Sequence, residues 1–267
     1  LVFTSVLTIL AAALVGCGSS KIAPDDKVIK VAASPVPHAE ILEQAAVILE
    51  AQGYTLEVTI FEDYVQPNEV VESGDFDANF FQHTPYLNSF NEEKNTHLVS
   101  IGGIHYEPLG IYPGQESDLT AIPEGATIAV PHDTTNEARA LLLLEANGII
   151  TLKEGAGITA TIKDIEENPY QVSIIELEAA QIPRTLQDVS FGILNGNYAA
   201  ELGLSTAEDA LAYELEDSEA AQTYVNVLVV KEGAENHKDV QALLDVLKSE
   251  EITQFILENY QDFIPFQ

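Results

Sequence analysis

The sequence is poor in basic residues and nearly free of cysteine. It has 11 lysines and arginines against 43 acidic residues, a net charge of −32, and one cysteine, Cys17. A single cysteine excludes a disulfide within the chain. An acidic surface repels phosphate, which argues against a nucleic-acid partner, and it also repels anionic lipid headgroups. Electrostatic attraction therefore cannot hold this protein on a membrane.

The first apolar run is too short for a typical transmembrane helix. It extends from Val2 to Val15 and is interrupted only by threonine and serine, whereas a membrane span needs about 20 residues. Its length is that of a signal-peptide core, and it ends in Leu14-Val15-Gly16-Cys17, which resembles the bacterial lipobox. We expect a signal peptide over 1–16, a lipid on Cys17 and a flexible tether over 17–27. The alternative is an ordinary signal peptide in which the cysteine is incidental.

Motifs for catalysis and for metal binding are also absent. The chain has no G-x-S-x-G sequence, and its six histidines show neither H-x-x-x-H nor H-E-x-x-H spacing. A zinc site would have to collect its ligands from distant loops. We therefore expect a binding protein without cofactor, metal or catalysis. A metal-binding lipoprotein, a hydrolase and a surface adhesin that uses the acidic face remain as alternatives.

What is present is an alternation of short apolar runs with amphipathic segments, typical of an α/β fold with mostly parallel strands. The apolar runs predict strands at 28–33, 56–61, 78–81, 127–130, 172–177, 190–194 and 225–230. Helical spacing predicts helices at 38–52, 67–72, 85–94, 136–147, 237–248 and 252–260, with Thr84 as the N-cap of the third and Gly148 ending the fourth.

The alternation stops and restarts near residue 110, which predicts two α/β lobes. The first would comprise 28–108 with 228–267, and the second 112–222, with crossovers near 106–111 and 224–227. In open α/β sheets ligands bind beyond the carboxyl ends of the strands. We therefore expect a ligand site in a hinged cleft between the lobes.

A polar segment directly after the strand at 127–130 is the strongest candidate for a binding site. Thr134 and Glu137 have the spacing of a capping box, which places Asn136 and Arg139 on one face of the first helical turns. A helix N-terminus and a guanidinium group both favour an anion such as a carboxylate. The alternative is a surface arginine that pairs with a nearby glutamate.

Further candidates are aromatic and amide side chains near strand ends. An apolar pocket with polar groups at the ends of its side chains could be lined by Tyr64, Phe81, His83 and Tyr86. The alternative is that these aromatic residues only pack in the core. Asn195 follows a strand and could simply serve a turn. Asn226 lies within an apolar run, where a buried amide must find partners, and near a predicted crossover.

These segments resemble the NlpA-type methionine-binding lipoproteins, the substrate-binding components of bacterial methionine ABC importers. The matching stretches occur in order over essentially the whole mature chain: Pro35-Val36-Pro37-His38-Ala39-Glu40, Asp63-Tyr64-Val65-Gln66-Pro67-Asn68, Asn79-Phe80-Phe81-Gln82-His83, Glu107-Pro108-Leu109-Gly110-Ile111-Tyr112, Thr135-Asn136-Glu137-Ala138-Arg139, Glu176-Leu177-Glu178-Ala179-Ala180-Gln181 and Asn195-Gly196-Asn197-Tyr198.

The resemblance implies a two-lobed periplasmic-binding-protein type II fold and a ligand-binding role on the outer face of the cell membrane. It implies that Arg139 and Asn136 hold the α-carboxylate of an amino acid. Asn195 and Asn226 would bind the rest of its polar head, and Tyr64, Phe81, His83 and Tyr86 would line the side-chain pocket. The implied partners are L-methionine, its D-form or a methionine-containing dipeptide, and the permease subunits of an importer.

Overall fold

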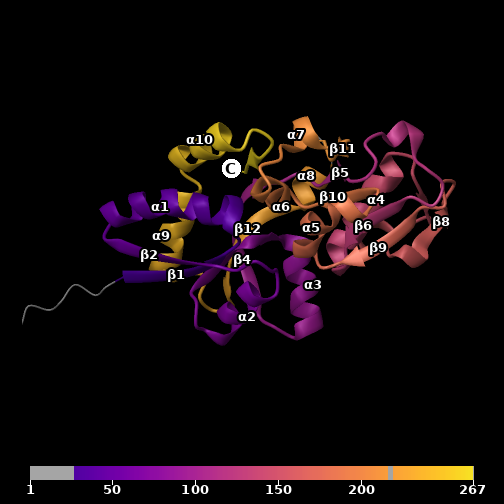
Figure 1. Ribbon diagram of the computed structural model, residues 1–267. Helices are drawn as coiled ribbons and strands as arrows, with labels where there is room; N and C mark the ends of the chain where they lie inside the picture. The colour runs from indigo at the N-terminus through magenta and orange to yellow at the C-terminus, as the bar shows by residue number, and fades with distance from the viewer. Residues whose placement is uncertain (1–26, 216–218, 267) are drawn as a thin grey trace, which may run out of the picture.

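The computed structural model describes residues 27–215 and 219–266, so the predicted signal peptide and Cys17 lie outside the described residues. Its strands form a six-stranded, a five-stranded and a small two-stranded sheet, and the two larger sheets lie side by side as the centres of two lobes (Figure 1). The chain has the two-lobed α/β fold expected from the sequence. No helix among the described residues is long and apolar enough to cross a membrane.

The six-stranded sheet has the order β13-β4-β12-β3-β1-β2. Its strands are β1 (Lys27–Ala33), β2 (Tyr54–Ile60), β3 (Ala78–His83), β4 (Leu98–Tyr106), β12 (Val225–Lys231) and β13 (Ile264–Pro265). Strand β1 runs parallel to β2 and β3, whereas β12 runs antiparallel to both β3 and β4. The central strands β3 and β12 are buried along nearly their whole length; β12 is largely apolar, whereas β3 also buries the polar side chains of Asn79, Gln82 and His83.

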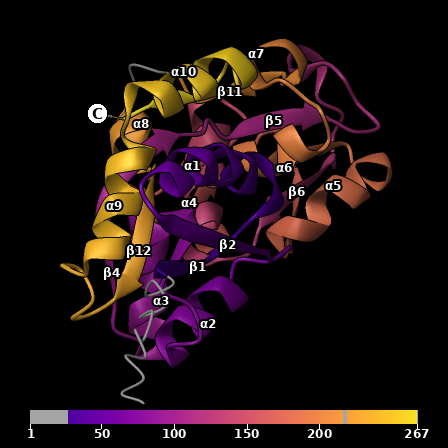
Figure 2. The same cartoon turned by 90° about the vertical axis from the view of Figure 1, so that its left-hand side faces the viewer.

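Helices cover both faces of this sheet. A short π-helical turn η1 (Pro35–Ala39) leads into α1 (Glu40–Ala51), which packs with α9 (Lys238–Leu247) and α10 (Glu250–Asn259) in the main core of the lobe. Figure 2 shows these three helices together on the viewer's side. The helices α2 (Gln66–Ser73) and α3 (Thr84–Lys94) cover the other face through Val71 and Leu87, which pack against β12.

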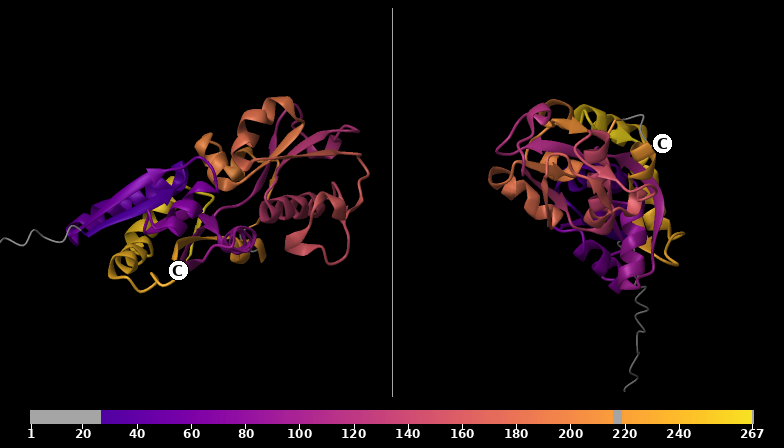
Figure 3. Two further views of the ribbon diagram at one scale, coloured as in Figure 1. Left: turned by 90° about the horizontal axis from the view of Figure 1, so that it is seen from below. Right: turned by 90° about the vertical axis from the view of Figure 1, so that its right-hand side faces the viewer.

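The five-stranded sheet has the order β11-β5-β10-β6-β9. Its strands are β5 (Gly110–Pro113), β6 (Thr127–Pro131), β9 (Ser173–Leu177), β10 (Phe191–Leu194) and β11 (Ala212–Tyr213). Helix α4 (Thr134–Ala146) packs on one face, while α5 (Ile182–Thr185) and α6 (Gly196–Glu201) contribute to the core on the other. Smaller elements complete this lobe: β7 (Thr151–Leu152), β8 (Ile165–Glu167), α7 (Thr206–Asp209) and α8 (Glu219–Thr223). Figure 3 shows both lobes from below and the second lobe end-on.

Several local predictions were wrong. Both sheets are mixed, because β12 in one and β5 in the other pair antiparallel with their neighbours. The N-cap of α3 is His83 rather than Thr84, which is the first helical residue. The N-cap of α4 is Asp133, so Thr134 and Glu137 form no capping box. The exact lobe boundaries stay a prediction, although the strands of the first sheet come from 27–106 and 225–265 and those of the second from 110–213.

Candidate functional site

A buried pocket lies between the two sheets, and all of the predicted ligand-binding residues line it. The first lobe contributes Tyr64, Phe81, His83, Tyr86 and Asn226, and the second contributes Asn136, Arg139 and Asn195. Gln82, Glu107, Gly196 and Asn197, which were not predicted, complete the lining. The lobes are closed so far that the cavity measures only about 20 Å³, about the room that one water molecule needs.

His83 joins the two lobes at the end of β3. As N-cap of α3 it accepts a hydrogen bond from the Tyr86 backbone N–H at its Nδ1 (3.1 Å). The proton therefore resides on Nε2, which donates to Asn136 Oδ1 across the cleft (3.0 Å). Burial, with a contribution from Arg139, lowers the pKa of His83 to about 3, so the ring is neutral.

Asn136 is held by its neighbours in the first turn of α4. Its side-chain Nδ2 donates to both carboxylate oxygens of Asp133 (2.8 and 3.0 Å). Its Oδ1 accepts from Asn195 Nδ2 (2.9 Å) as well as from His83. The amide is therefore occupied by protein partners, which suits it to orient His83 and Asn195.

Arg139 lies one turn further along α4 and is 3% exposed. Its Nε and Nη2 form a bidentate ion pair with Glu214 (2.8 and 2.6 Å), and Nη2 also donates to the Glu107 carbonyl (2.8 Å). Burial alone would lower the pKa of Arg139, but the Glu214 carboxylate raises it, so the group stays charged. The guanidinium carbon Cζ also lies 4.3 Å from the ring centroid of Tyr224 and 5.8 Å from that of Tyr106, so the group packs against two aromatic rings as it lines the pocket.

The aromatic end of the pocket is formed by Tyr64, Phe81 and Tyr86, whose ring centroids lie 5.7–6.0 Å apart. The Tyr64 hydroxyl donates to Asn197 Oδ1 across the cleft (2.5 Å), and the Tyr86 hydroxyl donates to the Tyr64 carbonyl (3.0 Å). Burial raises the pKa of both tyrosines, so both hydroxyls stay protonated. This end therefore presents aromatic rings to the pocket, and the tyrosine hydroxyl groups at its edge already have hydrogen-bond partners in the protein.

The rest of the lining is polar and is called the polar end below; Asn197 joins it to the aromatic end through its contact with Tyr64. Two amide atoms of this polar end have no partner among the residues that the structure describes. They are Asn195 Oδ1, an acceptor, and Asn197 Nδ2, a donor, and both are buried. Asn226, on β12, accepts a hydrogen bond from His38 Nε2 at its Oδ1 (3.1 Å). Its Nδ2 is therefore left as the group that it can offer to the pocket. A buried polar atom without a partner is costly, which indicates a site built for a polar ligand.

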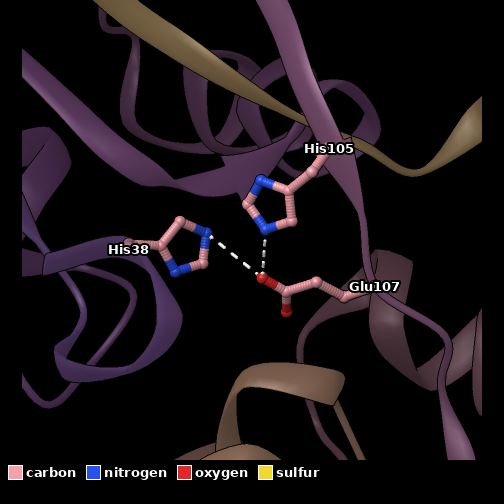
Figure 4. A group of neighbouring side chains, drawn as sticks. All are labelled: His38, His105 and Glu107. Atoms are coloured by element: carbon pink, nitrogen blue, oxygen red, sulfur yellow. Dashed lines mark hydrogen bonds and ion pairs between the residues drawn. The ribbon is translucent and has the colours of Figure 1, made fainter. Parts of the chain in front are cut away.

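His38 and His105 lie behind the pocket and converge on Glu107. His105 Nε2 lies 2.7 Å and His38 Nε2 3.4 Å from the same Glu107 oxygen, Oε1 (Figure 4). Burial lowers the pKa of His38 to about 4 and that of His105 to about 3, so both rings are neutral. Burial raises the pKa of the Glu107 carboxyl, whereas His38 and Arg139 oppose that shift.

These three residues form the group best suited to a metal ion among the described residues, with ligand atoms within 4.8 Å of one another. Two ligands of a tetrahedral zinc ion with bonds of about 2.0 Å would lie roughly 3.3 Å apart. The 2.7 Å between His105 and Glu107 is instead the length of a charge-assisted hydrogen bond. The geometry favours a hydrogen-bond network over a metal centre.

Comparison with known proteins places the chain in a family. The model of the NlpA lipoprotein family matches residues 29–265. This chain belongs to the NlpA lipoprotein family. The family's D-methionine-binding lipoprotein MetQ from Escherichia coli (strain K12) is 37% identical over 243 residues, which span 90% of this chain and 88% of that protein.

Solved structures of relatives have the same fold. A lipoprotein from Ruminococcus gnavus ATCC 29149 is 66% identical, with a TM-score of 0.89 over 90% of this chain and 100% of its own. A nutrient-binding protein from Burkholderia cenocepacia, solved bound to methionine, is 38% identical, with a TM-score of 0.85 over the same shares. The Escherichia coli and Burkholderia cenocepacia relatives are binding proteins by their names.

Proposed function

We propose that this protein binds methionine, or a close analogue such as D-methionine or a methionine-containing dipeptide, and delivers it to an ABC importer without chemical change. The observation that supports this most is the division of the pocket into an aromatic end and a polar end with unpaired groups. A thioether gains about 0.3–1.5 kcal/mol from each aromatic contact, so this wall suits a methionine side chain. Relatives that bind methionine share the family and the fold.

The polar end offers separate groups for the two charges of an amino acid. The Arg139 guanidinium group and Asn197 Nδ2 are donors suited to the α-carboxylate. Asn195 Oδ1 is an acceptor suited to the α-ammonium group, and Asn226 Nδ2 is a further donor. Asn136, whose amide is occupied by Asp133 and His83, would contribute by fixing Asn195 rather than by a strong contact of its own.

Calorimetry of the purified protein tests this proposal. We expect L-methionine to bind with micromolar or tighter affinity, and native mass spectrometry of freshly purified protein to show a co-purified ligand of matching mass. D-methionine and glycyl-methionine are the comparison ligands, because the same groups could hold either. The absence of binding to all three compounds would contradict the proposal.

We also propose that a lipid on Cys17 tethers the protein to the outer face of the cell membrane beside the permease subunits of the importer. A lipid anchor can overcome the repulsion that the acidic surface experiences, because each buried acyl CH₂ contributes about 0.8 kcal/mol. Tethering also raises the concentration of the binding protein near its importer.

The variant Cys17→Ser tests the anchor separately from the site. It should appear in the soluble fraction, bind methionine as the wild type does, and support methionine uptake poorly. A Cys17→Ser protein that stayed with the membrane would show that another feature holds it there.

A further inference from the structure

We propose that Glu107 accepts the ammonium group of the ligand, so that the pocket takes amino acids with a free α-amine and rejects N-acylated ones. This inference rests on the proposed function and narrows it: free methionine would bind, whereas glycyl-methionine, in which the methionine amine is acylated, would bind weakly. Neither the sequence motifs nor the names of the relatives assign a role to Glu107.

The first support is the balance of charge in the pocket. Arg139 is the only lysine or arginine that lines it, and the bidentate contact with Glu214 already neutralises this cation. Glu107 is a second carboxylate, 5% exposed, and the imidazoles that contact it are neutral. A buried carboxylate without a cation is costly. The ammonium group of a zwitterionic ligand supplies the missing charge.

The second support is the direction of the hydrogen bonds. Asn226 Oδ1 is an acceptor, so His38 Nε2 carries a proton and donates to it (3.1 Å). Glu107 Oε1 lies 3.4 Å from the same nitrogen. His38 Nδ1 then accepts from the Ser34 hydroxyl (2.6 Å). His105 Nε2 donates to the same Glu107 oxygen (2.7 Å). One neutral N–H donor, from His105, thus stabilises the carboxylate without cancelling its charge, and burial still raises its pKa, so a cationic ligand group would favour the ionised form of Glu107.

The third support is orientation. Both imidazole rings point at Oε1, and the second carboxylate oxygen points away from them (Figure 4). Glu107 is also part of the pocket lining, and the main-chain N–H of Asn197 approaches its carboxylate. Both imidazole contacts use Oε1, so Oε2 keeps acceptor capacity for a ligand in the pocket that Glu107 lines.

The carboxylate and ammonium sites are adjacent, as an α-amino acid requires. Arg139 Nη2 donates to the backbone carbonyl of Glu107, so the cation that would hold the ligand carboxylate contacts the residue that would hold its amine. Gly196 permits this arrangement, because a Cβ atom at that position would lie 2.7 Å from Glu107 Cβ. An N-acyl group would replace the ammonium charge and enlarge the group that faces Glu107.

The ligand itself provides the first test, by calorimetry on the wild-type protein. L-methionine, N-acetyl-L-methionine and 4-(methylthio)butanoate, which lacks the amine, share the same thioether end. We expect L-methionine to bind at least about 30-fold more tightly than either analogue, because removing one partner of a buried charge pair leaves the other charge buried and unpaired. Equal affinities would overturn the inference. A wild-type protein that binds none of the three would instead overturn the proposed function, and this inference with it.

The matched variant is Glu107→Gln, which keeps the shape and removes the charge. It should weaken L-methionine binding by about 30-fold or more and change the affinity for 4-(methylthio)butanoate by less than about 3-fold. Equal losses for both ligands would assign Glu107 a merely structural role and overturn the inference. Gly196→Ala crowds Glu107 without removing its charge. It should reduce the ratio by which the protein binds L-methionine more tightly than 4-(methylthio)butanoate.

The control variant is Glu137→Gln, which changes a buried carboxylate that accepts from the Ile162 N–H and lies outside the pocket lining. It should leave both affinities unchanged. The titration is repeated with added zinc and with a chelator. Methionine affinity that requires zinc would show that His38, His105 and Glu107 bind a metal, and would overturn the assignment of Glu107 to the ammonium group.

Discussion

The two ends of the pocket satisfy their hydrogen-bonding groups in different ways. At the aromatic end each tyrosine hydroxyl has a protein partner: Tyr64 donates to Asn197, Tyr86 to the Tyr64 carbonyl, and Tyr198 to the Glu62 carbonyl. At the polar end Asn195 Oδ1 and Asn197 Nδ2 have none among the described residues. An end whose polar groups already have protein partners distinguishes ligands mainly by shape and by ring contacts. An end with unpaired polar groups distinguishes ligands by charge and hydrogen bonds.

This difference predicts unequal losses when each end is altered, because unpaired charge costs more than lost ring contacts. Charge-bearing positions should dominate affinity, amides should follow, and aromatic positions should mainly change which side chain is preferred. Three substitutions test that order.

The largest effect is expected for Arg139→Ala. It leaves a buried ligand carboxylate without its cation, which costs about 3–5 kcal/mol of binding free energy. Calorimetry with L-methionine measures the loss, and circular dichroism checks the fold, because Glu214 loses its partner too. Arg184→Ala, at the only other arginine of the chain and outside the pocket lining, is the matched control. A folded Arg139→Ala protein whose affinity for L-methionine falls by less than about 10-fold would contradict the assignment.

An intermediate effect is expected for Asn195→Ala. The substitution removes an acceptor that faces the ligand and also a donor to Asn136, and we expect a loss of about 1–3 kcal/mol in methionine binding. Asn168→Ala changes an amide that closes a loop outside the pocket, and it should leave the affinity unchanged. If both variants bound methionine equally well, the unpaired atom of Asn195 would have no part in recognition.

The smallest effect is expected for Phe81→Leu, which keeps an apolar contact but removes an aromatic ring. The preference for methionine over norleucine, which lacks the sulfur atom, should fall by about 2- to 10-fold, matching the 0.3–1.5 kcal/mol of a thioether–aromatic contact. The measured quantity is the ratio of the two dissociation constants. A constant ratio with both affinities reduced would mean that Phe81 contributes shape alone.

The parts of the fold that the sequence predicted are those with dense apolar runs. Strands β1, β3 and β12 lie within a few residues of their predicted positions because nearly every side chain in them is apolar or buried. Strand β4 was missed because Ser100, Gly102 and Gly103 interrupt its apolar pattern. Gly102 is needed there because a Cβ would lie 2.6 Å from the Leu244 side chain of α9. Strand direction was also mispredicted, because local patterning does not report which neighbour a strand will have.

The site divides in a similar way. The residues carried by recognisable motifs, such as Asn136 and Arg139, do line the pocket, whereas Glu214 could not be found from the sequence. It pairs with an arginine 75 positions earlier in the chain, and it is one of 43 acidic residues, most of which read as a solvated surface. Glu107 carried a stronger signal, because it begins a motif that is shared with the family. Its partners His38 and His105 become visible only when η1 and β4 are brought together.

The hydrogen bonds that close the cleft also constrain how fast a ligand can arrive. Tyr64 with Asn197, Tyr198 with Glu62, His83 with Asn136, and Thr134 with Glu93 all join one lobe directly to the other. A cavity of about 20 Å³ cannot admit an amino acid until these contacts separate. Entry therefore proceeds through an opened form, and the observed association rate should level off at high ligand concentration, at the rate of opening. The same contacts would delay release of the ligand. An importer that separated the lobes would therefore determine when the ligand leaves.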